Sequence, residues 1–189
     1  LIKSIDFALN AGVTHISCYI LKIEPNTAFG KANLETLDLP DDEATADMYI
    51  KMSDYLESKG FEHYEISNFA LPGYRSKHNL KYWNQEQYLG LGPAAHSYIN
   101  DKRFYFDRDL EKYINNPKVI MDSEGGTLEE YIMLKLRLKK GLSLSELQSL
   151  YGEKPLIKIK EKAPFLKEQG LIDFDGERMG SRKLAKSKK

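Results

Sequence analysis

The sequence has a single cysteine, Cys18, among its 189 residues. One thiol excludes an internal disulfide bond, and it cannot by itself hold a zinc ion or an iron-sulfur cluster through thiolate ligands. Long apolar runs are also missing, because none approaches the ~18 residues that a membrane span requires, and the first residues lack the pattern of an export signal. We therefore predict a soluble, cytoplasmic protein without a membrane span.

The chain as a whole has a net charge of zero, because 28 Lys and Arg balance 28 Asp and Glu. The balance hides an uneven distribution: residues 1–126 carry 13 basic and 19 acidic side chains, and residues 127–189 carry 15 and 9. Paired glycines, Gly125 and Gly126, follow a polar stretch and favour a connection between domains. We predict a boundary at residue 126 and a basic, disordered tail over residues 181–189.

The first part of the chain contains two predicted helices. Apolar residues recur at helical spacing over residues 1–10, and Gly12 is placed to end that helix. A second helix begins after a cap at Asp41 or Asp42 and ends before Gly60. Because the chain opens inside a helix without a cap, we expect it to be a segment of a longer protein.

A run rich in β-branched and aromatic residues, 13–21, predicts a strand that is buried on both faces, as in a parallel sheet, and residues 61–66 predict a second strand. Alternating helices and strands are typical of an α/β fold, either a barrel or an open doubly wound sheet. In both folds, chemistry occurs at the C-terminal ends of the strands. The residues at these positions are Lys22, Ile23, Glu24, Ser67, Asn68 and Phe69. The plainer interpretation of the two charged residues is that they are solvated loop charges.

A polar and aromatic stretch begins at Ser76, which is placed to cap a short helix over residues 77–85. Four-residue spacing then makes two neighbouring pairs, His78 with Tyr82 and Asn79 with Trp83. An imidazole beside aromatic surface suits a porphyrin, whose iron takes an axial nitrogen and whose ring stacks on flat apolar groups. The alternative is a histidine packed in the aromatic core of a loop.

A glycine-rich stretch follows. Gly90 and Gly92 resemble half of a phosphate-binding loop, but the third glycine and a preceding strand are missing, so we discard a nucleotide phosphate site. The two glycines are expected to allow close backbone approach or tight turning. His96 is either a ligand contact or an ordinary half-buried histidine, and its spacing does not decide between the two.

Residues 127–180 show the pattern of a small helical module. Capping boxes predict helices from Thr127 and Ser143, and a third helix, broken at Pro164, follows them. The pair Asp175-Gly176 predicts a hairpin. Three helices and a hairpin indicate a winged-helix-like domain. Its net charge is only +1 without the tail, which argues against nucleic acid as a partner.

Four strings of residues occur in order along the chain: Cys18-Tyr19-Ile20-Leu21-Lys22-Ile23-Glu24-Pro25-Asn26-Thr27, Tyr64-Glu65-Ile66-Ser67-Asn68-Phe69-Ala70, His78-Asn79-x-x-Tyr82-Trp83 and Leu89-Gly90-Leu91-Gly92-Pro93-Ala94-Ala95-His96-Ser97. Together they resemble the oxygen-independent coproporphyrinogen III oxidase family, and within it the HemW branch, from residue 1 to about residue 180. The resemblance implies a radical S-adenosylmethionine (SAM) protein that acts as a heme chaperone. The third string is similar to the heme-associated signature of that branch, which the oxidase branch lacks.

The resemblance implies an α/β fold, made of the C-terminal part of a partial (β/α) radical SAM barrel over residues 1–126 and a winged-helix-like domain after it. For the site, it implies that His78 binds heme iron and that Asn79, Tyr82 and Trp83 contact the heme. The implied function is delivery of heme to an acceptor protein that the sequence does not identify. The alternative is a coproporphyrinogen III oxidase, which decarboxylates porphyrinogen propionates in porphyrin biosynthesis, and only the general family fold favours it.

Part of the family pattern falls outside this sequence. The cysteines that bind the family's 4Fe-4S cluster belong upstream of Leu1, with most of the SAM pocket, so the sequence resembles the C-terminal half of such a protein. Lys22 and His96 fall at SAM-adjacent positions that are apolar in the oxidase branch, so contact through the backbone is the expected role. Because the cluster ligands lie elsewhere, this chain alone is expected to have no radical SAM activity.

Overall fold

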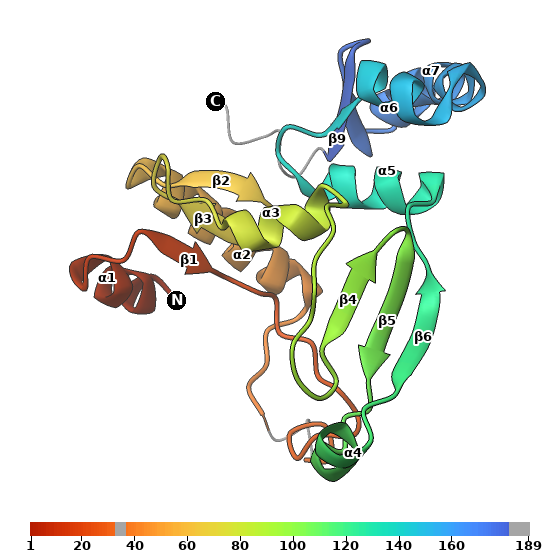
Figure 1. Ribbon diagram of the computed structural model, residues 1–189. Helices are drawn as coiled ribbons and strands as arrows, with labels where there is room; N and C mark the ends of the chain where they lie inside the picture. The colour runs from red at the N-terminus through yellow and green to blue at the C-terminus, as the bar shows by residue number, and fades with distance from the viewer. Residues whose placement is uncertain (33–36, 182–189) are drawn as a thin grey trace. The chain divides into compact units, whose positions relative to one another are not determined.

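The computed structural model describes residues 1–32 and 37–181, and Figure 1 shows its helices and strands. The backbone separates into two compact units, one formed by Leu1–Arg75 and one that begins at Ser76. The two compact units divide between Arg75 and Ser76, not at residue 126. The domain boundary at residue 126 stays a prediction. The predicted tail lies outside the described residues except for Ser181, which ends a strand.

The first unit contains two helices and a three-stranded sheet. Its elements are α1 (Ile2–Asn10), β1 (His15–Ser17), α2 (Asp42–Ser58), β2 (Glu62–Glu65) and β3 (Asn68–Ala70). The Asp41 carboxylate accepts a hydrogen bond from the Ala44 amide at 2.8 Å and so caps α2. Both predicted helices are confirmed. The core is formed by the buried side chains of Ile5, Met52, Leu56, Phe61 and Phe69.

The sheet of the first unit differs from the predicted one. β3 lies between β1 and β2 and is antiparallel to both, so the two predicted strands are not neighbours in a parallel sheet. The strand predicted over residues 13–21 is also too long, because β1 is a three-residue edge strand. Beyond it, the side chains of Tyr19 and Leu21 are 71% and 64% exposed. β1 ends at Ser17, so the apolar residues after it lie outside the sheet and the run is not buried on both faces.

A tight hairpin explains the difference. The chain turns at Ile66 and Ser67 after β2 and returns as β3, which takes the place beside β2 that a parallel neighbour would occupy. Asn68 and Phe69, expected at a strand end, are therefore inside a strand, 1% and 0% exposed. The Glu65 carboxylate accepts hydrogen bonds from the Ser67 amide, at 2.8 Å, and from the Asn68 side chain. These polar groups thus stabilise the turn.

The second unit begins with α3 (Lys77–Trp83), which carries the signature string, and continues into an antiparallel sheet. The strands are β4 (His96–Ile99), β5 (Lys102–Phe106) and β6 (Val119–Glu124), in that order across the sheet, with α4 (Leu110–Asn115) before β6 in the chain. Asn100 and Asp101 join β4 to β5, and their φ angles of 51° and 59° are those that a two-residue hairpin turn requires.

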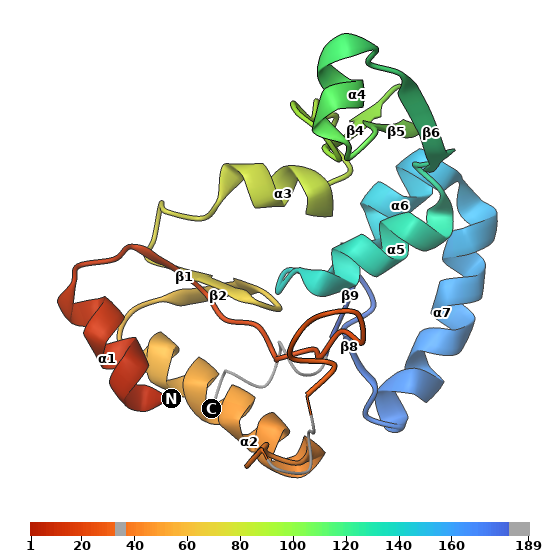
Figure 2. The same cartoon turned by 90° about the horizontal axis from the view of Figure 1, so that it is seen from below.

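A winged-helix-like module follows. Its elements are α5 (Leu128–Arg137), β7 (Leu142–Ser143), α6 (Leu144–Tyr151), α7 (Glu153–Glu168), β8 (Ile172–Phe174) and β9 (Arg178–Ser181), with sheet order β7-β9-β8. Figures 1 and 2 show α6 and α7 packed against each other. The hydroxyls of Thr127 and Ser143 accept hydrogen bonds from the amides of Glu130 and Glu146, at 3.2 and 3.4 Å. Both predicted helix starts are confirmed.

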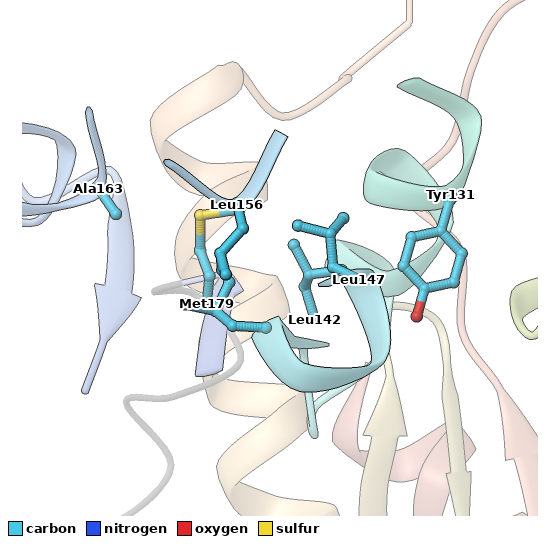
Figure 3. Close-up of a cluster of buried hydrophobic side chains, with 7 residues drawn as sticks. Tyr131, Leu142, Leu147, Leu156, Ala163 and Met179 are labelled. Atoms are coloured by element: carbon cyan, nitrogen blue, oxygen red, sulfur yellow. The ribbon is translucent and has the colours of Figure 1, made fainter. Parts of the chain in front are cut away.

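The core of this module lies between its helices and its sheet. Figure 3 shows its buried side chains, which are Tyr131, Leu142, Leu144, Leu147, Leu156, Ala163 and Met179. The expected break at Pro164 is wrong, because α7 runs through it. Ala163, directly before the proline, and Leu156, two turns earlier, are both buried in this core, so packing keeps the helix in place despite the missing hydrogen bond.

The glycine pair ahead of α5 makes specific hydrogen bonds. The Gly125 amide donates to the Asp101 carbonyl oxygen at 2.8 Å, and the Gly126 amide donates to the Glu130 carboxylate at 2.9 Å. The Tyr151 hydroxyl donates to the Gly126 carbonyl oxygen at 2.9 Å. The φ of Gly126 is 76°, which only glycine adopts without steric cost. The connection at residue 126 is therefore tied to both α5 and α6.

We expect the winged-helix-like module to bind duplex DNA weakly. Residues 127–180 carry 10 basic and 9 acidic side chains, so few phosphates could be neutralised. Fluorescence anisotropy with labelled DNA should give a Kd no tighter than roughly 10⁻⁴ M, and a shallow salt dependence, for the chain lacking residues 182–189. The full chain is the matched control for the tail. Sub-micromolar binding with a steep salt slope in the shortened chain would contradict this expectation.

Candidate functional site

The signature string lies on α3, as predicted. The Ser76 hydroxyl caps the helix by accepting a hydrogen bond from the Asn79 amide at 3.2 Å. His78 is exposed, and Tyr82 lies one turn further along the same face. His78 Nε2 and the Tyr82 hydroxyl oxygen are 2.9 Å apart, and the two rings meet edge-on at 5.0 Å between centroids. The expected pairing of imidazole and phenol is therefore present.

The contact with Tyr82 occupies one nitrogen of the His78 ring. The other, Nδ1, has no hydrogen-bond partner in residues 1–32 and 37–181. Burial raises the pKa of the Tyr82 phenol, and the neighbouring Tyr88 adds to the shift, so the hydroxyl stays protonated at neutral pH. An imidazole oriented through one nitrogen and open at the other has the arrangement of a metal ligand with an orienting partner.

Tyr82 continues into a row of tyrosines that the sequence interpretation missed. Its ring centroid is 4.5 Å from that of Tyr88, and Tyr88 is 6.2 Å from Tyr98. The backbones of Tyr88 and Tyr98 exchange two hydrogen bonds of 2.9 Å, one in each direction. The available signal was the position of these two tyrosines at either end of the glycine-rich stretch. A bridge across that stretch brings both rings to Tyr82.

A cavity of about 260 Å³ lies behind Tyr82. Its walls are mostly aromatic or apolar, and they include Tyr82, Trp83, Tyr88, Tyr98, Arg103 and Leu134. Pockets that enclose drug-sized ligands usually measure roughly 300 to 1,000 Å³. The cavity is therefore too small to enclose a porphyrin, and a ring bound at His78 would lie on the exposed surface of α3.

Arg103 supplies the charge at this cavity. Its guanidinium forms an ion pair with Glu130, and its Cζ lies 4.9 Å from the centroid of the Tyr98 ring. The Tyr98 hydroxyl donates to the Asp101 carboxylate at 2.8 Å. Burial and this hydrogen bond raise the pKa of Tyr98 to about 12. The cavity wall thus carries a paired arginine and a permanently neutral phenol.

Trp83, the last residue of α3, contacts a different element from His78. The Cζ atom of Arg137, on α5, lies 4.3 Å from the centroid of the indole ring. The indole Nε1–H is buried and has no acceptor within the described part of the chain. Five helical positions separate Trp83 from His78, which places the two side chains on different faces of α3. The structure brings His78 and Tyr82 together and directs Trp83 toward α5.

Lys22 and His96 each pair with an acidic residue. Lys22 belongs to the first unit, where its 83% exposed side chain forms an ion pair with Glu24 at 2.7 Å. His96 opens β4, where its ring stacks on Tyr105 at 4.8 Å and its Nδ1 lies 3.6 Å from the Asp122 carboxylate. Within the second unit, these two neighbours of His96 are on β5 and β6, not on α3. Their relation to SAM stays a prediction.

The glycines of the glycine-rich stretch have structural roles. A Cβ atom on Gly90 would lie 2.2 Å from the His96 carbonyl oxygen, so no other residue fits there. Gly92 has a φ of 109°, in the region that favours glycine. Close approach at one glycine and turning at the other are both confirmed.

The described residues hold no group of three or more His, Cys, Asp and Glu side chains that could bind a metal ion. Cys18 is half-buried, and burial raises the pKa of its thiol. Within residues 1–32 and 37–181, no helix is long and apolar enough to cross a membrane.

Comparison with known proteins gives a consistent set of relatives, although no family model matches the chain. It is 40% identical to the heme chaperone HemW of Synechocystis over 159 residues, which cover 78% of this chain and 39% of that protein. It is 36% identical to HemW of Bacillus subtilis, covering 89% and 51%, and 33% identical to HemW of Mycobacterium tuberculosis, covering 95% and 46%. The chain thus spans about half the length of the curated relatives it matches.

A solved structure supports the fold. Coproporphyrinogen III oxidase HemN from Escherichia coli, described as a radical SAM enzyme, matches 95% of this chain and 48% of its own with a TM-score of 0.66. At 17% identity, this likeness concerns the fold alone. The predicted α/β fold class is confirmed, without a closed barrel in the described residues. From the sequence relatives, the chain belongs to the HemW-type proteins.

Proposed function

We propose that this chain is the heme-binding part of a heme chaperone, which holds heme through His78 and passes it to an acceptor protein. The observation that carries the proposal is the exposed His78 imidazole, oriented by Tyr82 at Nε2 and open at Nδ1. The HemW relatives support it, because each is named a heme chaperone and resembles most of this chain.

The residues at α3 fit heme in the chemistry of their side chains. A neutral imidazole is an axial ligand of heme iron, and tyrosine rings offer the flat surface that a porphyrin stacks on. Tyr82 and Asn79, from the same signature, complete the proposed site, and Trp83 lies against Arg137 of α5. Heme is the cargo in this proposal, and an exposed site suits a cargo that must leave.

The cofactors of a radical SAM protein fit this chain less well. A 4Fe-4S cluster is held by several cysteine thiolates, and the sequence contains only Cys18. We propose that a cluster and SAM bind to the full-length protein. Backbone contacts at Lys22 and His96 would contribute to the SAM site, since their side chains pair with Glu24 and Asp122. A cytoplasmic location is part of the same proposal.

A porphyrinogen oxidase is the weaker candidate. Its support is the fold shared with HemN, at an identity that carries no residue-level argument. The more similar sequences are all named heme chaperones.

Titration with two porphyrins tests the proposal. The chain should bind heme with a shifted Soret band and bind metal-free protoporphyrin IX at least about tenfold more weakly, because only the iron complex gains the axial bond. Lys77→Ala, an exposed change next to the proposed ligand, is the control for altered helix charge and should keep the shifted band. Equal affinity for the two porphyrins would reject iron ligation and leave only apolar adsorption.

A further inference from the structure

Three consecutive residues at the C-terminal end of α3 each contact a different residue of α5. The pairs are Trp83 with Arg137, Asn84 with Lys135, and Gln85 with Glu130. We infer that these six residues, which we call the α3–α5 clamp, hold α3 so that His78 is presented to heme in a fixed orientation. Trp83 is then a positioning residue and not a stacking surface for the porphyrin. The inference deepens the proposed heme-binding function and rests on it.

α3 needs support from outside itself. It has seven residues, and none of them is buried. Isolated helices shorter than about 12 residues are marginal in water, because few hydrogen bonds offset the entropy of nucleation. The contact between His78 and Tyr82 requires one helical turn, so it is lost when the helix unwinds. Orientation of the proposed ligand therefore depends on whatever holds α3 in place.

The first pair joins an aromatic face to a cation. The Arg137 guanidinium carbon lies 4.3 Å from the Trp83 ring centroid, well within the ~6 Å over which this attraction acts. Tryptophan is the best aromatic partner for such a contact, and both side chains are half-buried, which strengthens it. Since the indole Nε1–H has no acceptor among the described residues, the ring is held by its face and not by a hydrogen bond.

The second pair uses a buried charge. Lys135 is only 5% exposed, and its ammonium donates a hydrogen bond to the Asn84 side-chain oxygen at 2.9 Å. Burial lowers the pKa of Lys135, with Lys140 adding to the effect. A buried ammonium without a partner is costly, so this hydrogen bond favours the position of Asn84 directly after α3.

The third pair ties the same end to the sheet. The Gln85 side-chain amide donates to the Glu130 carboxylate at 3.3 Å, and Glu130 also forms an ion pair with Arg103 of β5. Gln85 has a φ of 56°, a left-handed conformation that is unfavourable for a non-glycine residue. A residue keeps such a conformation where the surrounding contacts fix it. The chain after α3 is thus held by α5 and, through Glu130, by β5.

The test uses Arg137→Met, which keeps a long side chain and removes the charge over the indole. In the 189-residue chain we expect heme affinity to fall roughly fivefold, equivalent to about 1 kcal/mol, with the Soret maximum unchanged because His78 still binds the iron. Arg137→Lys keeps a cation and should recover part of the affinity. Combining Arg137→Met with Trp83→Leu should weaken binding no further than the worse single change, since both break one contact.

A heme-free measurement isolates the clamp. Trp83 is the single tryptophan of the chain, so its fluorescence reports on this contact alone. Arg137→Met should shift the emission maximum to longer wavelength as the ring gains solvent. Lys158→Met removes an exposed positive charge on α7, which contributes no residue to the clamp, and is the matched control, with emission and heme affinity expected to stay as in the parent chain.

Two results would overturn the inference. One is an unchanged emission maximum in Arg137→Met. The other is reduced heme affinity in Trp83→Leu with full affinity in Arg137→Met, which would place the indole against the heme itself. Heme binding that does not depend on His78 would instead reject the proposed function, and the emission of the heme-free variants would still decide whether the clamp exists.

Discussion

His78→Ala is expected to abolish the shifted Soret band and to lower heme affinity by at least about 100-fold. Removing a group that merely orients a metal ligand costs about 10- to 100-fold in metal affinity, so removing the ligand itself should cost more. Trp83 acts on heme only through the position of α3, so Trp83→Ala should weaken heme binding less than His78→Ala, which removes the iron ligand itself. Visible-light titration of heme into each variant measures both effects.

Tyr82→Phe is the matched variant for this measurement. It keeps the ring beside Tyr88 and removes the hydroxyl that lies 2.9 Å from His78 Nε2, so a loss of about tenfold is expected. His96, the other exposed histidine among the described residues, is the alternative iron ligand. If His96→Ala removes the shifted band and His78→Ala keeps it, the ligand is on β4 and the proposed site is wrong. The same comparison in the full-length protein includes any surface outside this chain.

The second large effect is an absence of radical chemistry. After anaerobic reconstitution with iron and sulfide, this chain is expected to hold no stoichiometric 4Fe-4S cluster and to form no 5′-deoxyadenosine from SAM. The reason is the ligand count, because a cluster of this kind is bound by several thiolates and Cys18 is the single cysteine. Its thiol is half-buried with a raised pKa, which further disfavours the thiolate that binds iron.

Iron and sulfide analysis together with product chromatography checks this expectation. Cys18→Ala is the control, and it should show the same background as the parent chain. A cluster in stoichiometric amount, or 5′-deoxyadenosine above that background, would mean that other side chains complete the coordination. The full-length protein then becomes the comparison that separates a property of this chain from one that needs the rest of the molecule.

Local elements followed from local chemistry. Asp41, Ser76 and Thr127 begin helices in the structure as their cap positions predict, because each side chain satisfies a backbone amide two or three residues away. The pairing of His78 with Tyr82 followed from helical spacing in the same way. Pro164 is the exception, since burial of Ala163 in the module core kept α7 continuous.

The sheets were less predictable, since strand pairing depends on residues far apart in the chain. The apolar pattern of residues 13–21 fits a buried central strand, but β1 is a short edge strand that ends at Ser17, and Tyr19 beyond it is exposed. Asn68 and Phe69 follow a strand in the sequence, and the turn at Ile66 and Ser67 returns them to the sheet as β3.

The sequence by itself determined the caps that begin α2, α3, α5 and α6, the HemW-type signature and the pairing of His78 with Tyr82, because each depends on residues within a few positions of one another. Tertiary structure decided which residues outside α3 contact the signature residues Trp83 and Tyr82. Trp83 lies beneath Arg137, and Tyr82 lies beside Tyr88, through contacts that no local spacing encodes. The physical reason is that packing and charge pairing act between elements that only the folded chain brings together.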